Sequence, residues 1–84
     1  MQKKNKCPCC GNLTFGNNFP GSYNICPVCY WEDDLVQFYD ENFEGGANEP
    51  SLKKARKNYE VFGAIDKEFI NHVRKPLKEE VPGV

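Results

Sequence analysis

A chain of 84 residues has room for one domain, and a domain of that size exposes so much surface that its apolar core alone gives marginal stability. The composition, 39% hydrophobic and 13% aromatic, excludes a disordered chain, so a further source of stability is expected. The net charge is -1, yet the charges are segregated: seven acids and no Lys or Arg fall between Lys6 and Lys53. This segregation argues against nucleic-acid binding by the first half of the chain.

Two cysteine turns come first along the chain. Cys7-Pro8-Cys9-Cys10-Gly11 and Cys26-Pro27-Val28-Cys29 both contain a pair of cysteines separated by two residues. That gap lets one tight turn aim two thiolates at the same ion, and two such turns are typical of zinc ribbons. The predicted ligands are Cys7, Cys10, Cys26 and Cys29. Four sulfurs leave no position for water, so the predicted site holds a structural Zn²⁺.

Two alternatives to this zinc site stay open. Iron is bound by the same four thiolates in rubredoxins, although Tyr30 and Trp31 follow the second pair where rubredoxins usually have glycine. Disulfides are the other alternative, but five cysteines are an odd number. No apolar run follows the charged N-terminus, so neither a signal peptide nor a membrane span is predicted, and we expect a reducing, cytoplasmic location.

Cys9 is the cysteine left over from the predicted ligand set. A one-residue gap from Cys7 closes a turn less well, and Cys10 alone is followed by a glycine that can take a positive φ. Cys9 is therefore predicted to be either a small, half-buried side chain or a redox-active thiol close to the metal.

The predicted elements give a single domain over residues 1–84. Within the ribbon, 7–31, strands near 13–15 and 22–25 are expected to pair across a loop at 16–21. An acidic irregular segment, 32–50, follows it. Two helices occupy 51–75: one runs from the cap Ser51 to residue 62 before Gly63, and the other starts at Asp66 and ends before Pro76. With a mobile tail at 76–84, the predicted fold is a small α+β metal-stabilised domain, a zinc-ribbon or rubredoxin-like β-hairpin with two C-terminal helices.

An interface is predicted in the acidic segment, where aromatic residues are more numerous than so small a core hides. Its candidate residues are Trp31, Asp33, Asp34, Tyr39 and Glu41. We expect the partner to be another protein of basic character, as for a regulator, an adaptor or an immunity-type protein. Core packing is the alternative for Trp31, and capping of a turn is the alternative for Asp33 or Asp34.

Other functions are disfavoured by the residues. Adjacent acids such as those at 32–34 point in different directions and His72 stands alone, so no enzymatic activity is predicted. The basic residues at 53–57 could contact phosphate, which keeps a nucleic-acid-binding ribbon as an alternative. Gly45 to Asn48 is interpreted as a turn.

The chain resembles the bacterial cysteine-rich CPCC family. The resemblance rests on both cysteine turns, on Trp31-Glu32-Asp33-Asp34, on Gly45-Gly46-Ala47-Asn48, and on later matches as far as Pro76. It implies zinc binding and this fold, but no activity. Members often have Glu where this chain has Lys54, which removes a capping box from the first helix.

Overall fold

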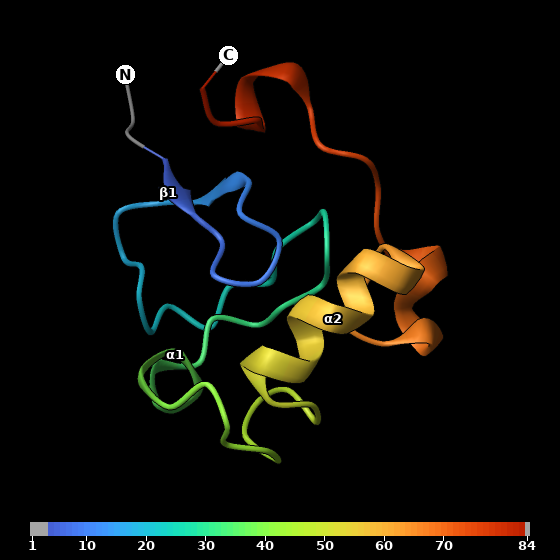
Figure 1. The fold of residues 1–84 in the computed structure, drawn as a ribbon. Helices are drawn as coiled ribbons and strands as arrows, with labels where there is room; N and C mark the ends of the chain where they lie inside the picture. The colour runs from blue at the N-terminus through green and yellow to red at the C-terminus, as the bar shows by residue number, and fades with distance from the viewer. Residues whose placement is uncertain (1–3, 84) are drawn as a thin grey trace.

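The computed structural model of the protein describes residues 4–83, and two cysteine turns of the same construction organise it (Figure 1). In each turn the N–H of the first cysteine, Cys7 or Cys26, donates to the carbonyl five residues later at 2.8 Å. The N–H four residues after that cysteine donates back to the cysteine carbonyl, also at 2.8 Å. Each turn therefore reverses the chain by itself.

Strand pairing differs from the prediction. The strand expected at 13–15 is β2 (Leu13–Phe15), but it pairs antiparallel with β1 (Asn5–Lys6), and these two strands flank the first cysteine turn. The strand predicted at 22–25 is wrong, because only Ile25 makes a bridge there, to Glu32 across the second turn. The reason is local: each cysteine turn brings together its own flanking residues, so the two turns are not joined through a shared hairpin.

A short helix lies in the segment that was predicted to be irregular. This helix, α1, spans Leu35–Tyr39 and begins at Asp34, whose side chain accepts a hydrogen bond from the Gln37 N–H. It buries Gln37, half-buries Phe38 and leaves Leu35, Val36 and Tyr39 exposed. The interpretation of 32–50 as irregular is therefore wrong over these five residues.

The first C-terminal helix is confirmed by α2 (Leu52–Phe62), which begins after the cap Ser51 and ends at Gly63 with φ 79°. Leu52 and Ala55 are the buried residues on the apolar face of this helix. The second is a 3₁₀ helix, η1 (Lys67–His72), which contacts α2. Its expected cap, Asp66, accepts from the Glu68 N–H. Residues 76–84, predicted to be mobile, contain the 3₁₀ turn η2 (Lys78–Glu80), which contacts β2; Val84 lies outside the described residues.

The core lies where the two cysteine turns meet α2. Its largest fully buried side chains include Trp31, Phe15, Leu52 and Ile65. Figure 1 shows the β1–β2 pair above, α2 to one side and α1 below. Within residues 4–83, none of the helices has the length and apolar character needed to cross a membrane.

Candidate metal centre

The two cysteine turns bring four sulfurs into one cluster. The Sγ atoms of Cys7, Cys10, Cys26 and Cys29 all lie within 4.8 Å of one another. The Sγ–Sγ distance is 3.6 Å for Cys7 and Cys29 and 3.7 Å for Cys10 and Cys26. A disulfide requires about 2.05 Å between its sulfurs, so none of these pairs is bonded.

These distances fit a tetrahedral ion. Four sulfurs at about 2.3 Å from a central Zn²⁺ would be separated from each other by about 3.8 Å, close to the two shortest distances in the cluster. Cys7, Cys26 and Cys29 are buried and Cys10 is half-buried. With four sulfur donors and no other group in the cluster, a bound metal would have no position for substrate, so the site is suited to a structural role.

Hydrogen bonds to the sulfurs support the charge that such a site needs. The hydroxyl of Thr14 donates to Sγ of Cys26 at 3.1 Å, and the N–H of Trp31 donates to Sγ of Cys29 at 3.4 Å. Donors of this kind stabilise thiolates and orient them toward a metal.

The sulfurs also act strongly on one another. The pKa of Cys26 is held below its usual range because Cys10 and then Cys29 hydrogen-bond to its sulfur. The pKa of Cys29 is raised, first by its hydrogen bond with Cys10 and then by that with Cys26. Four thiolates cannot all form in so small a buried volume without compensation, which a divalent cation provides.

The backbone after each pair has the same left-handed conformation. Gly11 has φ 80°, as predicted, and Tyr30 at the equivalent position of the second turn has φ 76°. A left-handed conformation is ordinary for glycine and strained for a bulky residue, so the second turn keeps a tyrosine at a steric cost.

Cys9 packs in the hydrophobic core and is not among the four clustered cysteines. Its exposed fraction is 9%, so this small side chain is more fully buried than the half-buried side chain that was predicted. Its redox activity stays a prediction.

Three of the predicted interface residues are not on the surface. Trp31 is fully buried in the core, and the carboxylate of Asp33 accepts from the N–H and hydroxyl of Ser22 at 2.8 and 2.7 Å. Asp34 is buried and has the capping role of its alternative interpretation, although it caps the helix α1 and not a turn. The prediction of these three as interface residues is therefore wrong. Tyr39 and Glu41 are exposed.

The role of the Gly45 to Asn48 turn was missed by sequence reasoning. The side-chain amide of Asn48 makes two hydrogen bonds to the backbone of Glu32. It accepts from the Glu32 N–H and donates to the Glu32 carbonyl, both at 2.8 Å. The Gln37 amide donates to three carbonyls of residues 43–50 and accepts from Asn48. The loop therefore closes the fold beside the second cysteine turn, and Asn48 is the one residue of its sequence that signals this.

A comparison with protein families gives one result for nearly the whole chain. No curated protein matches the sequence. The profile of the cysteine-rich CPCC family matches residues 5–80, a range that includes both cysteine turns, α1, α2 and the four-cysteine cluster. The chain therefore belongs to the cysteine-rich CPCC family.

Proposed function

We propose that this protein is a zinc-stabilised module that binds another protein. Zinc is the metal expected for four cysteine sulfurs in two Cys-x-x-Cys turns, and an all-thiolate site has a structural role. Iron is the competing metal, and binding it would make the site an electron carrier.

The observation that carries the protein-binding proposal is the inverted orientation of α1. Its buried side chain is the polar Gln37, while Leu35, Val36 and Tyr39 are 43%, 56% and 75% exposed. Phe43 and Tyr23 are also exposed. A surface helix normally turns its apolar side inward, so this arrangement supports a role for the apolar side in contact with a partner.

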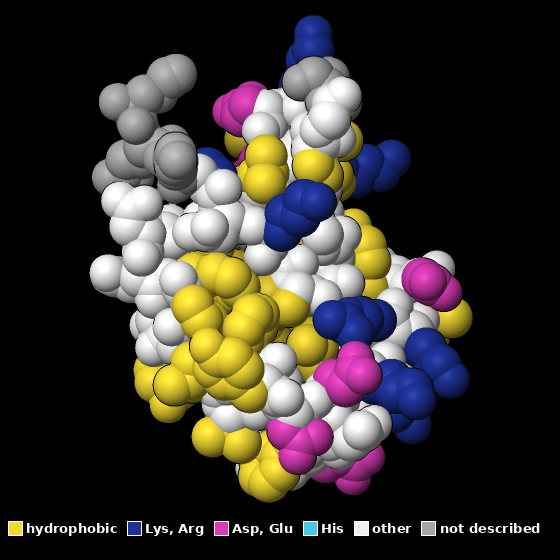
Figure 2. All heavy atoms as spheres, turned by 60° about the vertical axis from the view of Figure 1, so that its left-hand side comes forward, with side chains coloured by type: hydrophobic (Ala, Val, Ile, Leu, Met, Phe, Trp, Pro, Cys, Tyr) yellow, Lys and Arg dark blue, Asp and Glu magenta, His cyan; other side chains and the backbone are white. Residues whose placement is uncertain are grey.

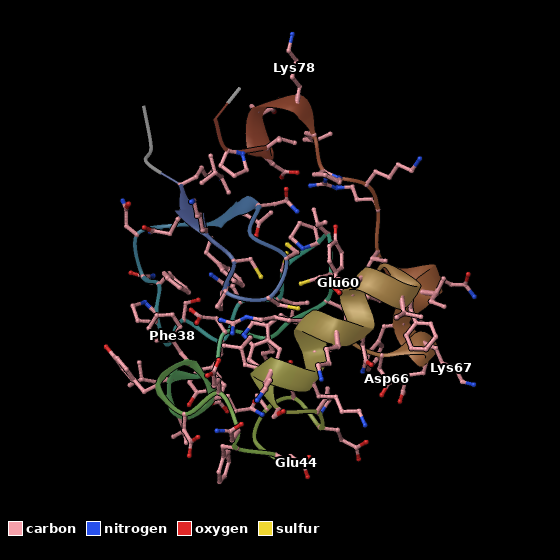
Figure 3. The ribbon with its side chains drawn as sticks, viewed as in Figure 1. Phe38, Glu44, Glu60, Asp66, Lys67 and Lys78 are labelled. Atoms are coloured by element: carbon pink, nitrogen blue, oxygen red, sulfur yellow. The ribbon has the colours of Figure 1, made fainter. Side chains whose placement is uncertain are left out.

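The surroundings of α1 favour a basic partner. Figure 2 shows hydrophobic side chains gathered on the face that α1 occupies, with acidic side chains beside them. Asp40 and Glu44 are exposed near this helix, and Glu41 pairs with Arg56 at 2.8 Å. Phe38, labelled beside α1 in Figure 3, packs its ring edge-on against that of Phe19, with the ring centroids 5.2 Å apart. Phe38 thus holds the helix against the rest of the protein, while the exposed Tyr39 remains available to contact a partner.

Affinity capture from the native host tests this proposal. The double variant Val36→Ser/Tyr39→Ser removes the outer apolar surface of α1, and Val61→Ser, at an equally exposed position on α2, is the matched control. We expect a basic protein to be captured by the wild type and by Val61→Ser, and its yield to fall about tenfold in the double variant, as the loss of two buried contacts predicts. Equal yields from all three proteins would refute the proposal.

A further inference from the structure

A hollow of about 330 Å³ lies on the side of the second cysteine turn, at the small end of the range for ligand sites. Three segments line it: the bridge residues Ile25 and Glu32 with Tyr30 between them, the loop 47–50, and four residues around the start of η1, Ile65, Asp66, Glu68 and Phe69. It is separate from the metal centre, because none of the four clustered cysteines lines it.

The charges around this hollow have one sign. Four carboxylates line it, those of Glu32, Glu49, Asp66 and Glu68, and no Lys, Arg or His does. Among residues 4–83 the ion pairs are Arg56 with Glu41 and Arg74 with Glu80, so none of the four lining acids is neutralised by a cation of the chain. The hollow is therefore complementary to a cation.

The nearest basic residues along the chain do not fill it. Figure 3 shows Lys67 extending outward from the molecule, whereas its neighbour Asp66 lies closer to α2. His72 contacts the ring of Tyr30 with a centroid distance of 5.6 Å but does not line the hollow. None of the basic residues within 4–83 therefore supplies a cation to this position, and an external cation can take it.

The walls of the hollow are aromatic and aliphatic. Tyr30 and Phe69 stack with their centroids 4.5 Å apart, and Ile25 is exposed beside them. Tyr30 holds this place from a left-handed backbone that glycine adopts without strain. Retained strain of this kind is typical of functional positions, and here it fixes an aromatic ring in the hollow.

A bare metal ion is a poor match for this arrangement. Among the described residues, the cysteines form the one group of three or more donors close enough to share an ion, so the four carboxylates do not converge on a point. A flat, extended cation that stacks on aromatic rings and pairs with separated carboxylates fits better, and the guanidinium of arginine has these properties.

We propose that this hollow binds an arginine side chain of a partner protein. The aliphatic stem lies against Ile25 and the aromatic pair, and the guanidinium is held by the carboxylates of Glu32 and Glu68. This inference rests on the proposed function, because the arginine belongs to a partner protein. It does not require that the partner contacts α1.

The test is an NMR titration of the zinc-loaded full chain with the capped peptide acetyl-Gly-Arg-Gly-amide. The same peptide with citrulline, which has arginine's shape without its charge, is the ligand control. We expect saturable shifts at the amide signals of Ala47 and Phe69 with arginine and none with citrulline. In Glu32→Gln/Glu68→Gln the affinity should fall about fivefold, as expected for two partly exposed charge pairs, whereas Glu60→Gln/Glu79→Gln, with the same charge loss on exposed acids elsewhere, should bind as the wild type does.

Several results would overturn the inference. They are the absence of saturable shifts with the arginine peptide, equal shifts with citrulline, and equal weakening by both double variants. If free agmatine binds with higher affinity than the peptide, the occupant is a small molecule and the proposal of a partner's arginine side chain is refuted. The variant Val36→Ser/Tyr39→Ser should keep its arginine binding, so a failure at α1 and a failure at the hollow are distinguishable.

Discussion

Gly46 is the position where one added methyl group should be most damaging. A Cβ there would lie 2.8 Å from Oδ2 of Asp34 and 2.9 Å from Cδ and Oε1 of Gln37. Neither side chain can move aside, because both are buried and both hold the loop through hydrogen bonds, including that from the Ala47 N–H to Asp34 at 2.8 Å. Gly46 does not have a positive φ, so its requirement is for space and not for backbone conformation.

The cost of Gly46→Ala follows from these contacts. Overpacking a tight site costs about 1–3 kcal/mol, and weakening one or two hydrogen bonds adds about 0.5–1.5 kcal/mol for each. We therefore expect a loss of about 2–4 kcal/mol in the free energy of unfolding, a large part of what a small domain has. Gly16→Ala is the control, because its Cβ would meet nothing within 4 Å and its φ is not positive. Its effect should stay within about 1 kcal/mol.

The assay is urea denaturation in zinc-buffered solution, followed by the fluorescence of the buried Trp31. Elemental analysis accompanies it, because both variants should keep their metal. A Gly46→Ala protein within about 0.5 kcal/mol of the wild type would refute the steric reasoning. Loss of metal from this variant would show that the loop acts through the cysteine site, contrary to the expectation.

Three further predictions concern the metal, pH and nucleic acid. Serine at Cys7, Cys10, Cys26 or Cys29 should abolish metal binding and unfold the chain, whereas Cys9→Ser should cost at most about 1–2 kcal/mol; thermal melts with elemental analysis decide this, and metal retained by Cys10→Ser but lost by Cys9→Ser would contradict the ligand set. Burial opposes ionisation of Asp34, but the N–H groups of Ala47 and Gln37 hold its pKa below the usual range. The stabilisation that ionised Asp34 gives the folded state is therefore complete above the unfolded-state pKa of about 3.9, and it is lost as pH falls through the lower folded-state pKa. The difference in unfolding free energy between wild type and Asp34→Asn should therefore shrink on acidification. A difference unchanged down to about pH 2 would contradict this. Mobility-shift assays at about 150 mM salt should show no submicromolar binding of DNA or RNA, because the exposed cations of α2 offer few phosphate contacts and Arg56 is already paired with Glu41; tight binding at that salt would contradict the charge argument.

The parts of the fold that the sequence predicted well depend on neighbouring residues. The gap between paired cysteines specifies each turn, Ser51 specifies where α2 begins, and Gly63 specifies where it ends. Capping groups and positive-φ glycines act within one turn of the chain, so their effect is visible in a short stretch of sequence. The same holds for Asp66 at the start of η1, although the 3₁₀ form of that helix was not predicted.

The orientation of α1 could not be predicted in this way. Sequence reasoning assumes that apolar residues face the core, but Gln37 occupies the buried position because its amide satisfies three carbonyls of a distant loop. Five residues are also too few to show a helical period. The burial of Asp33 has a similar cause, since its partner Ser22 is eleven residues earlier and lies at the position where a strand was expected.

The interface prediction failed for Trp31 for a different reason. The number of aromatic residues exceeds what a small core was expected to hide, yet the side chain of Trp31 is completely buried. The core includes the clustered cysteines, and Trp31, two residues after Cys29, belongs to it. Exposed aromatics lie on either side of Trp31 in the sequence, among them Tyr23 before it and Tyr39 and Phe43 after it.

The second cysteine turn makes contacts that connect the metal centre to the C-terminal half of the chain. The carbonyl of Cys29 accepts from the Ile65 N–H at 2.9 Å, and the carbonyl of Pro27 accepts from the Arg74 N–H at 3.2 Å. The ring of Tyr30 stacks on Phe69 of η1. Each of these contacts is made by a residue of the turn or by the residue directly after it. A metal that fixed the four sulfurs would therefore also fix the position of η1 and of one wall of the acidic hollow. The hydrogen-bond network of Gln37 and Asn48 connects to this turn through the backbone of Glu32. The hollow should therefore depend more strongly on the metal than α1 does.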